Sequence, residues 1–229
     1  MIQLYNVSKR YSRDSVAVND LSLKIDKGEF VYVTGASGAG KTTFLRMLYV
    51  AERPTRGQIL VDGQNITRIR SHHIPYLRRK IGVVFQDFKL LQSRSVYENV
   101  AFALEAQGKK RFEVSKKVYQ ALKEVGLEHR LQRKPQELSG GEQQRIAIAR
   151  ALVVDPLILL ADEPSGNLDL GVTLEIMELF KRANARGTTV LLATHDYNLH
   201  QRFPRRVITL DEGKLVGDQR PLDSVGVEH

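Results

Sequence analysis

Short runs of apolar residues alternate with longer stretches of helical periodicity along this chain. Three of the runs, residues 30–34, 157–161 and 190–193, are apolar at nearly every position, a pattern typical of strands buried on both faces. Because strands that alternate with helices form parallel sheets covered by helices, this pattern predicts an α/β fold. The expected strands are residues 2–7, 22–25, 30–34, 58–61, 81–85, 157–161, 189–193 and 207–210.

A different pattern marks the strands expected at 2–7, 22–25 and 58–61, in which apolar and polar residues alternate. Such strands are buried on one face only, so we expect them to form a smaller antiparallel sheet at one side. Between residues 86 and 155 no strong strand pattern occurs, and helices are predicted at 96–104, 112–125 and 140–152. The sequence thus predicts one domain over 1–229, with a helical subdomain at about 87–155 inserted into the α/β core.

Composition narrows the class of protein. A chain of 229 residues that is 42% hydrophobic and 27% charged is large enough for a core and is not wholly disordered. The absence of cysteine excludes a disulfide framework, a thiolate metal site and a cysteine nucleophile. No uninterrupted apolar run exceeds five residues, and the first residues lack the apolar stretch of a signal peptide. We therefore expect a cytoplasmic protein.

The formal net charge of +9 is concentrated in two places. Residues 68–80 contain five basic residues and no acid, and a second cluster lies between residues 109 and 117. A positive surplus suits an anionic partner such as nucleic acid, an acidic membrane surface or phosphates, although a solvated surface explains either cluster equally well. The clusters are Arg68, Arg70, Arg78, Arg79 and Lys80, and Lys109, Lys110, Arg111, Lys116 and Lys117.

Residues 35–42 match the phosphate-loop pattern G-x-x-x-x-G-K-[ST] in full, between an expected strand and an expected helix at 43–50. Its glycines let backbone N–H groups turn toward phosphate oxygens, and the helix N-terminus adds positive potential. Lys41 is expected to reach the β- and γ-phosphates, and the Thr42 hydroxyl to bind Mg²⁺. The nucleotide-binding residues expected here are Gly35, Ala36, Ser37, Gly38, Ala39, Gly40, Lys41, Thr42 and Thr43.

Two further segments contain candidate catalytic and ligand-binding residues. The buried run 157–161 leads into Asp162 and Glu163; we expect Asp162 to hold Mg²⁺ and Glu163 to orient or deprotonate the attacking water. Treated as neighbours on a strand, the two carboxylates point to opposite sides. Farther upstream, Ser139 and Glu142 form a capping box, and the glycines between them expose N–H groups that suit a second anion site. Its residues are Ser139, Gly140, Gly141, Glu142 and Gln143.

Together, the phosphate loop, the Leu-Ser-Gly-Gly-Glu-Gln motif at 138–143, the strand ending in Asp-Glu and a later lone histidine resemble the ABC ATPase family. The resemblance implies a P-loop NTPase (RecA-like) core, ATP and Mg²⁺ as ligands, ATP hydrolysis, and two copies paired head to tail so that 139–143 of one chain cap the ATP of the other. It also implies roles for single residues. Tyr11 would stack on adenine, Gln86 would sense the γ-phosphate and contact the metal, Asp169 would lie in the loop between the two sites, and His195 would be the switch histidine.

Five segments resemble a narrower group, the ABC ATPases of bacterial cell division, which act with an integral membrane subunit. These segments are 52–54, 74–87, 90–91, 96–100 and 160–169. This resemblance implies a peripheral position on the cytoplasmic face of the inner membrane. In the stretch after Gln86, the apolar residues Phe88, Leu90 and Leu91 are expected to form part of a groove for a helix of that subunit, the alternative being that they only pack the helical insertion. ATPases of lipoprotein-releasing and macrolide exporters share much of the pattern and remain an alternative. Ala36 and Thr42 stand where relatives often carry histidine and serine, which preserves the hydroxyl.

An ABC ATPase associated with nucleic acid is a third interpretation, suggested by the charge. Those that bridge DNA insert a long coiled coil between the phosphate loop and the second motif. Here only 98 residues separate Lys41 from Ser139, and they contain helix-breaking residues that exclude such a rod. We therefore expect no nucleic acid, and expect the basic clusters to face anionic lipid headgroups or the membrane partner. The helix-breaking residues are Pro75, Gly82, Gly108, Gly126 and Pro135.

Overall fold

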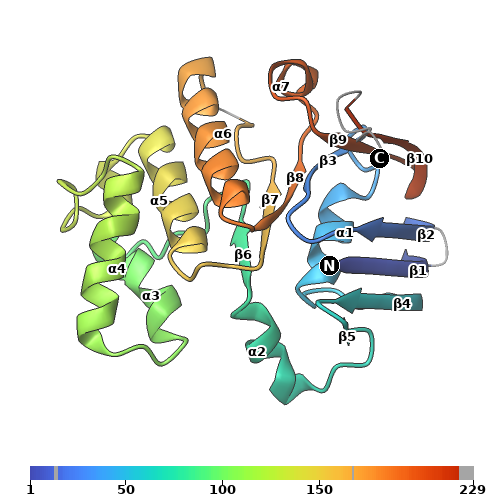
Figure 1. Ribbon diagram of the computed structural model, residues 1–229, viewed down its shortest axis with the longest axis horizontal. Coiled ribbons are helices and arrows are strands. Elements are labelled where there is room, and N and C mark those ends of the chain that lie inside the picture. Colours follow the sequence, from blue (N-terminus) through green and yellow to red (C-terminus); the bar gives the residue numbers. More distant parts are fainter. Residues whose placement is uncertain (13–14, 167, 222–229) are drawn as a thin grey trace, which may run out of the picture. The chain divides into compact units, whose positions relative to one another are not determined.

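The computed structural model describes residues 1–12, 15–166 and 168–221, and its helices and strands are labelled in Figure 1. The chain forms two compact units. The first comprises Met1–Ile74 with the described part of Thr189–His229, and the second comprises Pro75–Thr188. The boundaries predicted for a helical insertion, about 87–155, remain a prediction, but all of that segment lies in the second unit.

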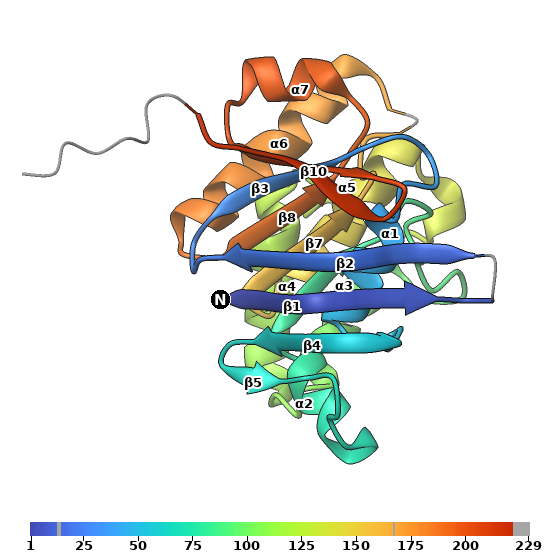
Figure 2. The same cartoon turned by 90° about the vertical axis from the view of Figure 1, so that its right-hand side faces the viewer.

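An antiparallel sheet forms one part of the first unit. Its strands are β2 (Val16–Ile25), β1 (Ile2–Arg10), β4 (Arg56–Val61) and β5 (Gln64–Asn65), which Figure 2 shows side by side in this order. Ile2 lies opposite Ile25 on one side and Val61 on the other, and all three side chains are buried. The predicted antiparallel sheet is confirmed, although β2 begins six residues before the expected strand.

The second part of the first unit is a run of strands in the order β10, β9, β3, β8. Strands β3 (Phe30–Thr34), β8 (Thr189–Ala193) and β9 (Arg206–Asp211) are parallel, and β10 (Lys214–Gln219) pairs antiparallel with β9. The apolar runs of β3 and β8 are buried as predicted. Helices α1 (Lys41–Leu48) and α7 (Tyr197–Arg202) and a 3₁₀ turn at Ser71–His73 complete this unit.

Strand β10 was not predicted, because its mixed, half-exposed pattern carries no clear strand signal. The turn before it explains why it forms. Glu212 and Gly213 both adopt positive φ, 45° and 77°, which is the conformation of a tight two-residue hairpin. The hairpin brings β10 back along β9.

The second unit contains the parallel pair β6 (Ile81–Val84) and β7 (Ile158–Asp162), with Ile81 opposite Ile158. Four helices accompany it: α3 (Val96–Glu105), α4 (Arg111–Glu124), α5 (Gly140–Leu152) and α6 (Leu170–Ala185). In Figure 1, α5 lies between α4 and α6 and contacts both. Short helical segments lie at Ile74–Arg78 (α2), which spans the boundary between the units, and at Pro135–Glu137.

Helix α5 lies very close to β6. A Cβ atom added to Gly82 would stand 2.5 Å from the Ala151 carbonyl oxygen, so only glycine fits at this point of the strand. The three helices predicted in this unit are confirmed, α5 with the bounds expected, whereas α6 was not predicted. Among the described residues, no helix has both the length and the apolar character needed to cross a membrane.

Candidate functional site

The phosphate loop lies in the first unit, between the end of β3 at Thr34 and the start of α1 at Lys41. Its glycines are required sterically. Gly35 and Gly40 adopt φ of 140° and 101°, and Cβ atoms there would stand 2.1 Å from the Leu210 oxygen and 2.2 Å from the Ala17 oxygen. Two backbone segments thus approach the loop as closely as glycine allows. Residues 36–38 are exposed, so the outer side of the loop is open.

Lys41 is the first residue of α1, yet its side chain turns back over the loop. Its ammonium group donates hydrogen bonds to the carbonyl oxygens of Gly35 at 2.8 Å and Ala36 at 3.0 Å, and the side chain is buried. The N-cap of α1 is Gly40, which supplies no side-chain cap. A helix start without a side-chain cap, next to a fixed ammonium group, is suited to bind an anion.

Tyr11 and Thr43 meet beside this loop. Tyr11 follows the end of β1, its side chain is 51% exposed, and its hydroxyl lies 3.4 Å from Thr43 Oγ1 in the first turn of α1. Lys9 Nζ lies 4.9 Å from the centroid of the Tyr11 ring. An exposed aromatic ring next to a phosphate-binding loop is placed to stack on a base.

His195 lies two residues beyond β8 and lines a hollow of about 670 Å³ together with Thr34, Gly35 and Ala36. The first unit therefore brings together the loop, Tyr11 and His195, which are spread over almost the whole sequence. Sequence reasoning missed His200 in the wall of the same hollow. Its ring packs against Tyr32 at 4.6 Å, and burial lowers the pKa of its imidazole.

In the second unit, Asp162 is the last residue of β7 and Glu163 lies in the turn that follows. Glu163 has a φ of 46°, and its carbonyl oxygen accepts a hydrogen bond from the Gly166 N–H at 3.2 Å. Glu163 therefore lies outside the strand, in a left-handed turn, so the strand alternation on which the expected opposite directions rested does not extend to it.

The same turn brings Glu163 near Gln86, which follows β6 by two residues. A methyl group built on Gly166 would lie 3.9 Å from both the Gln86 Nε2 atom and the Glu163 Oε2 atom. An amide and a carboxylate from segments 77 residues apart thus face one space.

The motif at 138–143 forms the capped start of α5. Glu142 Oε2 accepts hydrogen bonds from the Ser139 N–H at 2.9 Å and the Ser139 hydroxyl at 3.0 Å, and Ser139 Oγ accepts from the Glu142 N–H. These bonds from Ser139 lower the pKa of the Glu142 carboxyl. The capping box is confirmed, and Ser139 and Gly140 are exposed at the helix end.

Two hydrogen-bonding side chains of α5, the buried Gln144 and the half-buried Arg150, were missed by sequence reasoning. Gln144 is fully buried, and its Nε2 donates to the Pro164 carbonyl oxygen at 2.6 Å, in the turn that holds Glu163. At the other end of the helix, Arg150 donates to the carbonyl oxygens of Phe88 and Lys89, both at 2.7 Å. One helix therefore holds both segments that carry Glu163 and Gln86. For Gln144, the sequence signal was a polar residue at a position of the helix that faces the core.

Arg150 stabilises an uncommon backbone conformation. Phe88 and Lys89 have φ of 59° and 47°, a left-handed pair of non-glycine residues, which costs free energy unless the surroundings fix it. Burial lowers the pKa of the Arg150 guanidinium, because desolvation disfavours its charged form. The segment directly after Gln86 is thus fixed by a side chain of α5.

The structure also bears on the predictions for Asp169 and for the groove after Gln86. Asp169 caps α6: its Oδ1 accepts a hydrogen bond from the Val172 N–H at 2.9 Å, while Asn167 in the same motif lies outside the described residues. Leu90 is buried, so the expected groove cannot include it; Phe88 and Leu91 are only half-buried. Leu90, at 7% exposure, belongs to the buried hydrophobic core.

Comparisons with known proteins agree with this geometry. The ABC transporter family model matches residues 18–166. The cell division ATP-binding protein FtsE of Mycobacterium tuberculosis is 51% identical and that of Bacillus subtilis 48%, each covering 96% of this chain and 96% of the relative. FtsE of Escherichia coli K12 is 45% identical over 95% of this chain and 98% of its own.

Among solved structures, the dimeric ATP-binding cassette MJ0796 in a post-hydrolysis state bound to ADP and Pi has a TM-score of 0.89 and 37% identity, covering 96% of this chain and 98% of its own. CbiO1 of Clostridium perfringens, part of an ABC transporter complex, has a TM-score of 0.87 and 32% identity over 97% of this chain and 89% of its own. These similarities confirm the predicted α/β fold of the ABC ATPase type. The chain therefore belongs to the ABC transporter family, in which it is similar over almost its whole length to the FtsE proteins.

Proposed function

We propose that this chain is the ATP-binding and ATP-hydrolysing subunit of a bacterial inner-membrane complex that acts in cell division. The observation that carries the proposal is the phosphate loop, in which Lys41 is already folded over Gly35 and Ala36, in a chain similar to FtsE over 96% of its length. The partner is an integral membrane subunit resembling FtsX. The complex controls cell-wall hydrolases at the septum.

In the first unit, the Tyr11 ring stacks on adenine and the N–H groups of the loop and of the start of α1 bind the phosphate oxygens. Lys41 exchanges its carbonyl partners for the β- and γ-phosphates. His195 contacts the γ-phosphate from the wall of the hollow that it shares with Gly35. These residues supply binding and orientation, which carry most of the catalysis of phosphoryl transfer.

Oxygen donors suit Mg²⁺: the hydroxyl of Thr42, the amide oxygen of Gln86 and the carboxylate of Asp162 are hard ligands of the kind this ion prefers. When bound, Mg²⁺ neutralises charge on the phosphates. Hydrolysis itself rests on Glu163, whose carboxylate orients a water and accepts its proton. Gln86, on the same space beside Gly166, holds that water in line.

A second copy of the chain completes each site. The N-cap and first residues of α5 cap the ATP held by the partner copy. They are Ser139, Gly140, Gly141, Glu142 and Gln143. Two observations support this: Ser139 and Gly140 are exposed, and the similar cassette MJ0796 is described as dimeric. The head-to-tail pair forms when ATP is bound and separates after hydrolysis.

The alternative that this chain drives a lipoprotein-releasing or macrolide-type exporter shares every proposed site residue, but the most similar relatives reported above are FtsE proteins. The test is affinity purification of the full-length chain from detergent-solubilised membranes of its host. We expect an integral membrane protein resembling FtsX to co-purify. Recovery of an exporter subunit instead, or of nucleic acid alone, would overturn the proposed function.

A further inference from the structure

Helix α4 of the second unit has two contrasting faces. Val114, Val118 and Leu122 are buried against the rest of the unit. The opposite face carries, at intervals of four, three and four residues, an alternating row of aromatic and basic side chains that are all exposed. We refer to this row, Phe112, Lys116, Tyr119 and Lys123, as the α4 stripe.

The aromatic residues of the α4 stripe are unusually accessible. Phe112 is 78% exposed, more than any other large hydrophobic residue among those that the structure describes, and Tyr119 is 50% exposed. An isolated exposed apolar residue needs no explanation. Two aromatic rings on one helix face, each next to a lysine, form a surface with both apolar and cationic character.

Three more cations, Lys109, Lys110 and Arg111, directly precede the stripe and are exposed. Within residues 1–12, 15–166 and 168–221, no ion pair neutralises any of these three or the two lysines of the stripe. The nearby acid Glu113 instead accepts a hydrogen bond from the Lys110 backbone N–H at 3.4 Å. Residues 109–123 therefore combine five exposed cations that lack an ion pair among the described residues with two exposed aromatic rings.

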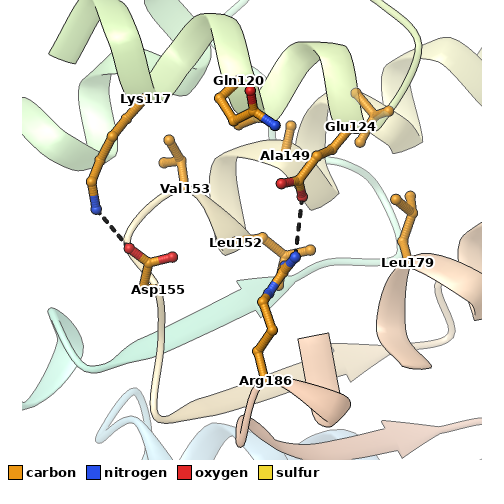
Figure 3. Close-up of a pocket in the computed structure, with 11 residues that line it drawn as sticks. Lys117, Gln120, Glu124, Ala149, Leu152, Val153, Asp155, Leu179 and Arg186 are labelled. Atoms are coloured by element: carbon orange, nitrogen blue, oxygen red, sulfur yellow. Dashed lines mark hydrogen bonds and ion pairs between the residues drawn. The ribbon is translucent and has the colours of Figure 1, made fainter. Parts of the chain in front are cut away.

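Lys117, which belongs to the same basic cluster in the sequence, lies on another side of the helix. Figure 3 shows it pointing to Asp155, with which it forms an ion pair of 2.6 Å, while Glu124 is paired with Arg186 at 3.5 Å. These pairs lie at the edge of a hollow of about 240 Å³. On that side the charges of α4 are neutralised within the unit, so the unneutralised charge is confined to the stripe and the residues before it.

We propose that the α4 stripe binds directly to the anionic surface of a lipid bilayer. Aromatic rings favour the level of the lipid headgroups, and lysines beside them reach anionic headgroups with their long side chains. Because the inner face of α4 is buried in the unit, only the outer rings enter the headgroup region, as in an amphipathic helix lying in the interface. The stripe is a convex helix face, whereas single-stranded nucleic acid binds in a groove with aromatic platforms.

This contact goes beyond attachment through a membrane subunit and does not depend on ATP hydrolysis. Each cation near an anionic surface strengthens binding by about fivefold, and salt weakens it. Neutralising two lysines of the stripe is thus expected to lower vesicle affinity by about twenty-five-fold. The contribution of the cations comes from their position, not from the net charge of the protein.

The first experiment measures binding of the full-length protein to vesicles that mix phosphatidylcholine and phosphatidylglycerol, and to vesicles of phosphatidylcholine alone. The double variant Lys116→Gln/Lys123→Gln is compared with Lys27→Gln/Lys214→Gln, which removes the same charge from exposed positions of the first unit. We expect only the stripe variant to lose binding to the mixed vesicles, while ATP binding is unchanged in both. Equal losses in the two variants would overturn the proposal, because net charge alone would then explain binding.

The second experiment uses the fact that the chain contains no tryptophan. In Phe112→Trp, fluorescence reports from the stripe alone; Val216→Trp on β10 is the control, because Val216 is similarly exposed at 60%. Mixed vesicles should shift the emission of the first variant to shorter wavelength and leave the second unchanged. No shift at position 112, or a shift produced by DNA but not by vesicles, would contradict the lipid contact. Neither vesicle binding nor tryptophan emission depends on turnover. A failure of the lipid contact is therefore distinguishable from a failure of the proposed ATPase function.

Discussion

The phosphate loop of the first unit and the Glu163 region of the second unit are built in different ways. Residues 35–43 form one continuous segment, and the bonds that shape it come largely from within it, as when Lys41 folds back onto Gly35 and Ala36. The Glu163 region combines segments around residues 86–89, 139–144 and 162–166. Side-chain hydrogen bonds from α5 hold its outer two segments, and the one from Gln144 is buried.

The two regions depend on different kinds of residue. A continuous loop depends on the residue types within it, because glycines and a following helix set its shape. An assembled region also depends on residues that never touch ligand, here Gln144 and Arg150. Substitutions in the two regions separate these two kinds of dependence, and the largest effect is expected for Glu163.

Glu163→Gln removes the proposed proton acceptor and keeps the shape of the side chain. Turnover should fall by on the order of 10²–10⁴, with ATP binding retained. The trapped nucleotide should also stabilise a dimer, detectable by size-exclusion chromatography with ATP. Glu178→Gln, on α6, is the matched control and should hydrolyse normally. Near-normal turnover in Glu163→Gln would remove this residue from the mechanism.

Lys41→Ala removes an ammonium group that is fixed over the loop. Charge-assisted hydrogen bonds contribute about 1.5–3 kcal/mol each, so ATP affinity of the isolated chain should fall by about ten- to a hundredfold in a nucleotide titration. Ser139→Arg should leave that affinity nearly intact and abolish hydrolysis, because it blocks only the partner's site. Loss of ATP binding by isolated Ser139→Arg would contradict a site completed by the second copy.

Arg150→Met cuts the bonds to Phe88 and Lys89 while keeping a long side chain. Two carbonyl oxygens lose their donor, so the free energy of unfolding should fall by about 2–4 kcal/mol in urea titration. In the folded variant, turnover should fall while ATP affinity of the isolated chain stays constant, and Arg150→Lys should restore part of the turnover. Arg145→Met, which removes only an ion pair with the half-exposed Glu175, is the control. An equal loss of ATP affinity in Arg150→Met would show a general effect on the fold.

Gln144→Leu fills the same buried volume without donating to Pro164. One unsatisfied carbonyl oxygen costs about 1–3 kcal/mol, so a smaller loss of stability is expected than for Arg150→Met. Turnover should fall by less than in Glu163→Gln, with unchanged ATP affinity, because only the turn that places Glu163 is loosened. Gln120→Leu, at an exposed position of α4, is the control and should leave turnover unaffected. Equal turnover in the two variants would mean that the Pro164 bond does not position Glu163.

Features whose causes are local could be predicted from the amino-acid sequence. The phosphate loop follows from three glycines and a lysine between a strand and a helix, the capping box from Ser139 and Glu142, and the buried strands β3 and β8 from continuous apolar runs. In each case the interacting groups lie within a few residues of one another, so residue type and spacing are enough. The ABC transporter family was recognisable from these segments.

Features that join distant segments became visible only in the folded chain. The left-handed turn at Glu163 replaced the expected strand alternation, Leu90 became buried, and Lys117 was separated from the other cations of its cluster by its ion pair with Asp155. Gln144 and Arg150 acquired their roles from carbonyl groups 20 and 61 or 62 residues away. Such contacts depend on how helices pack against loops, and neither spacing nor composition records which carbonyl a buried donor will meet.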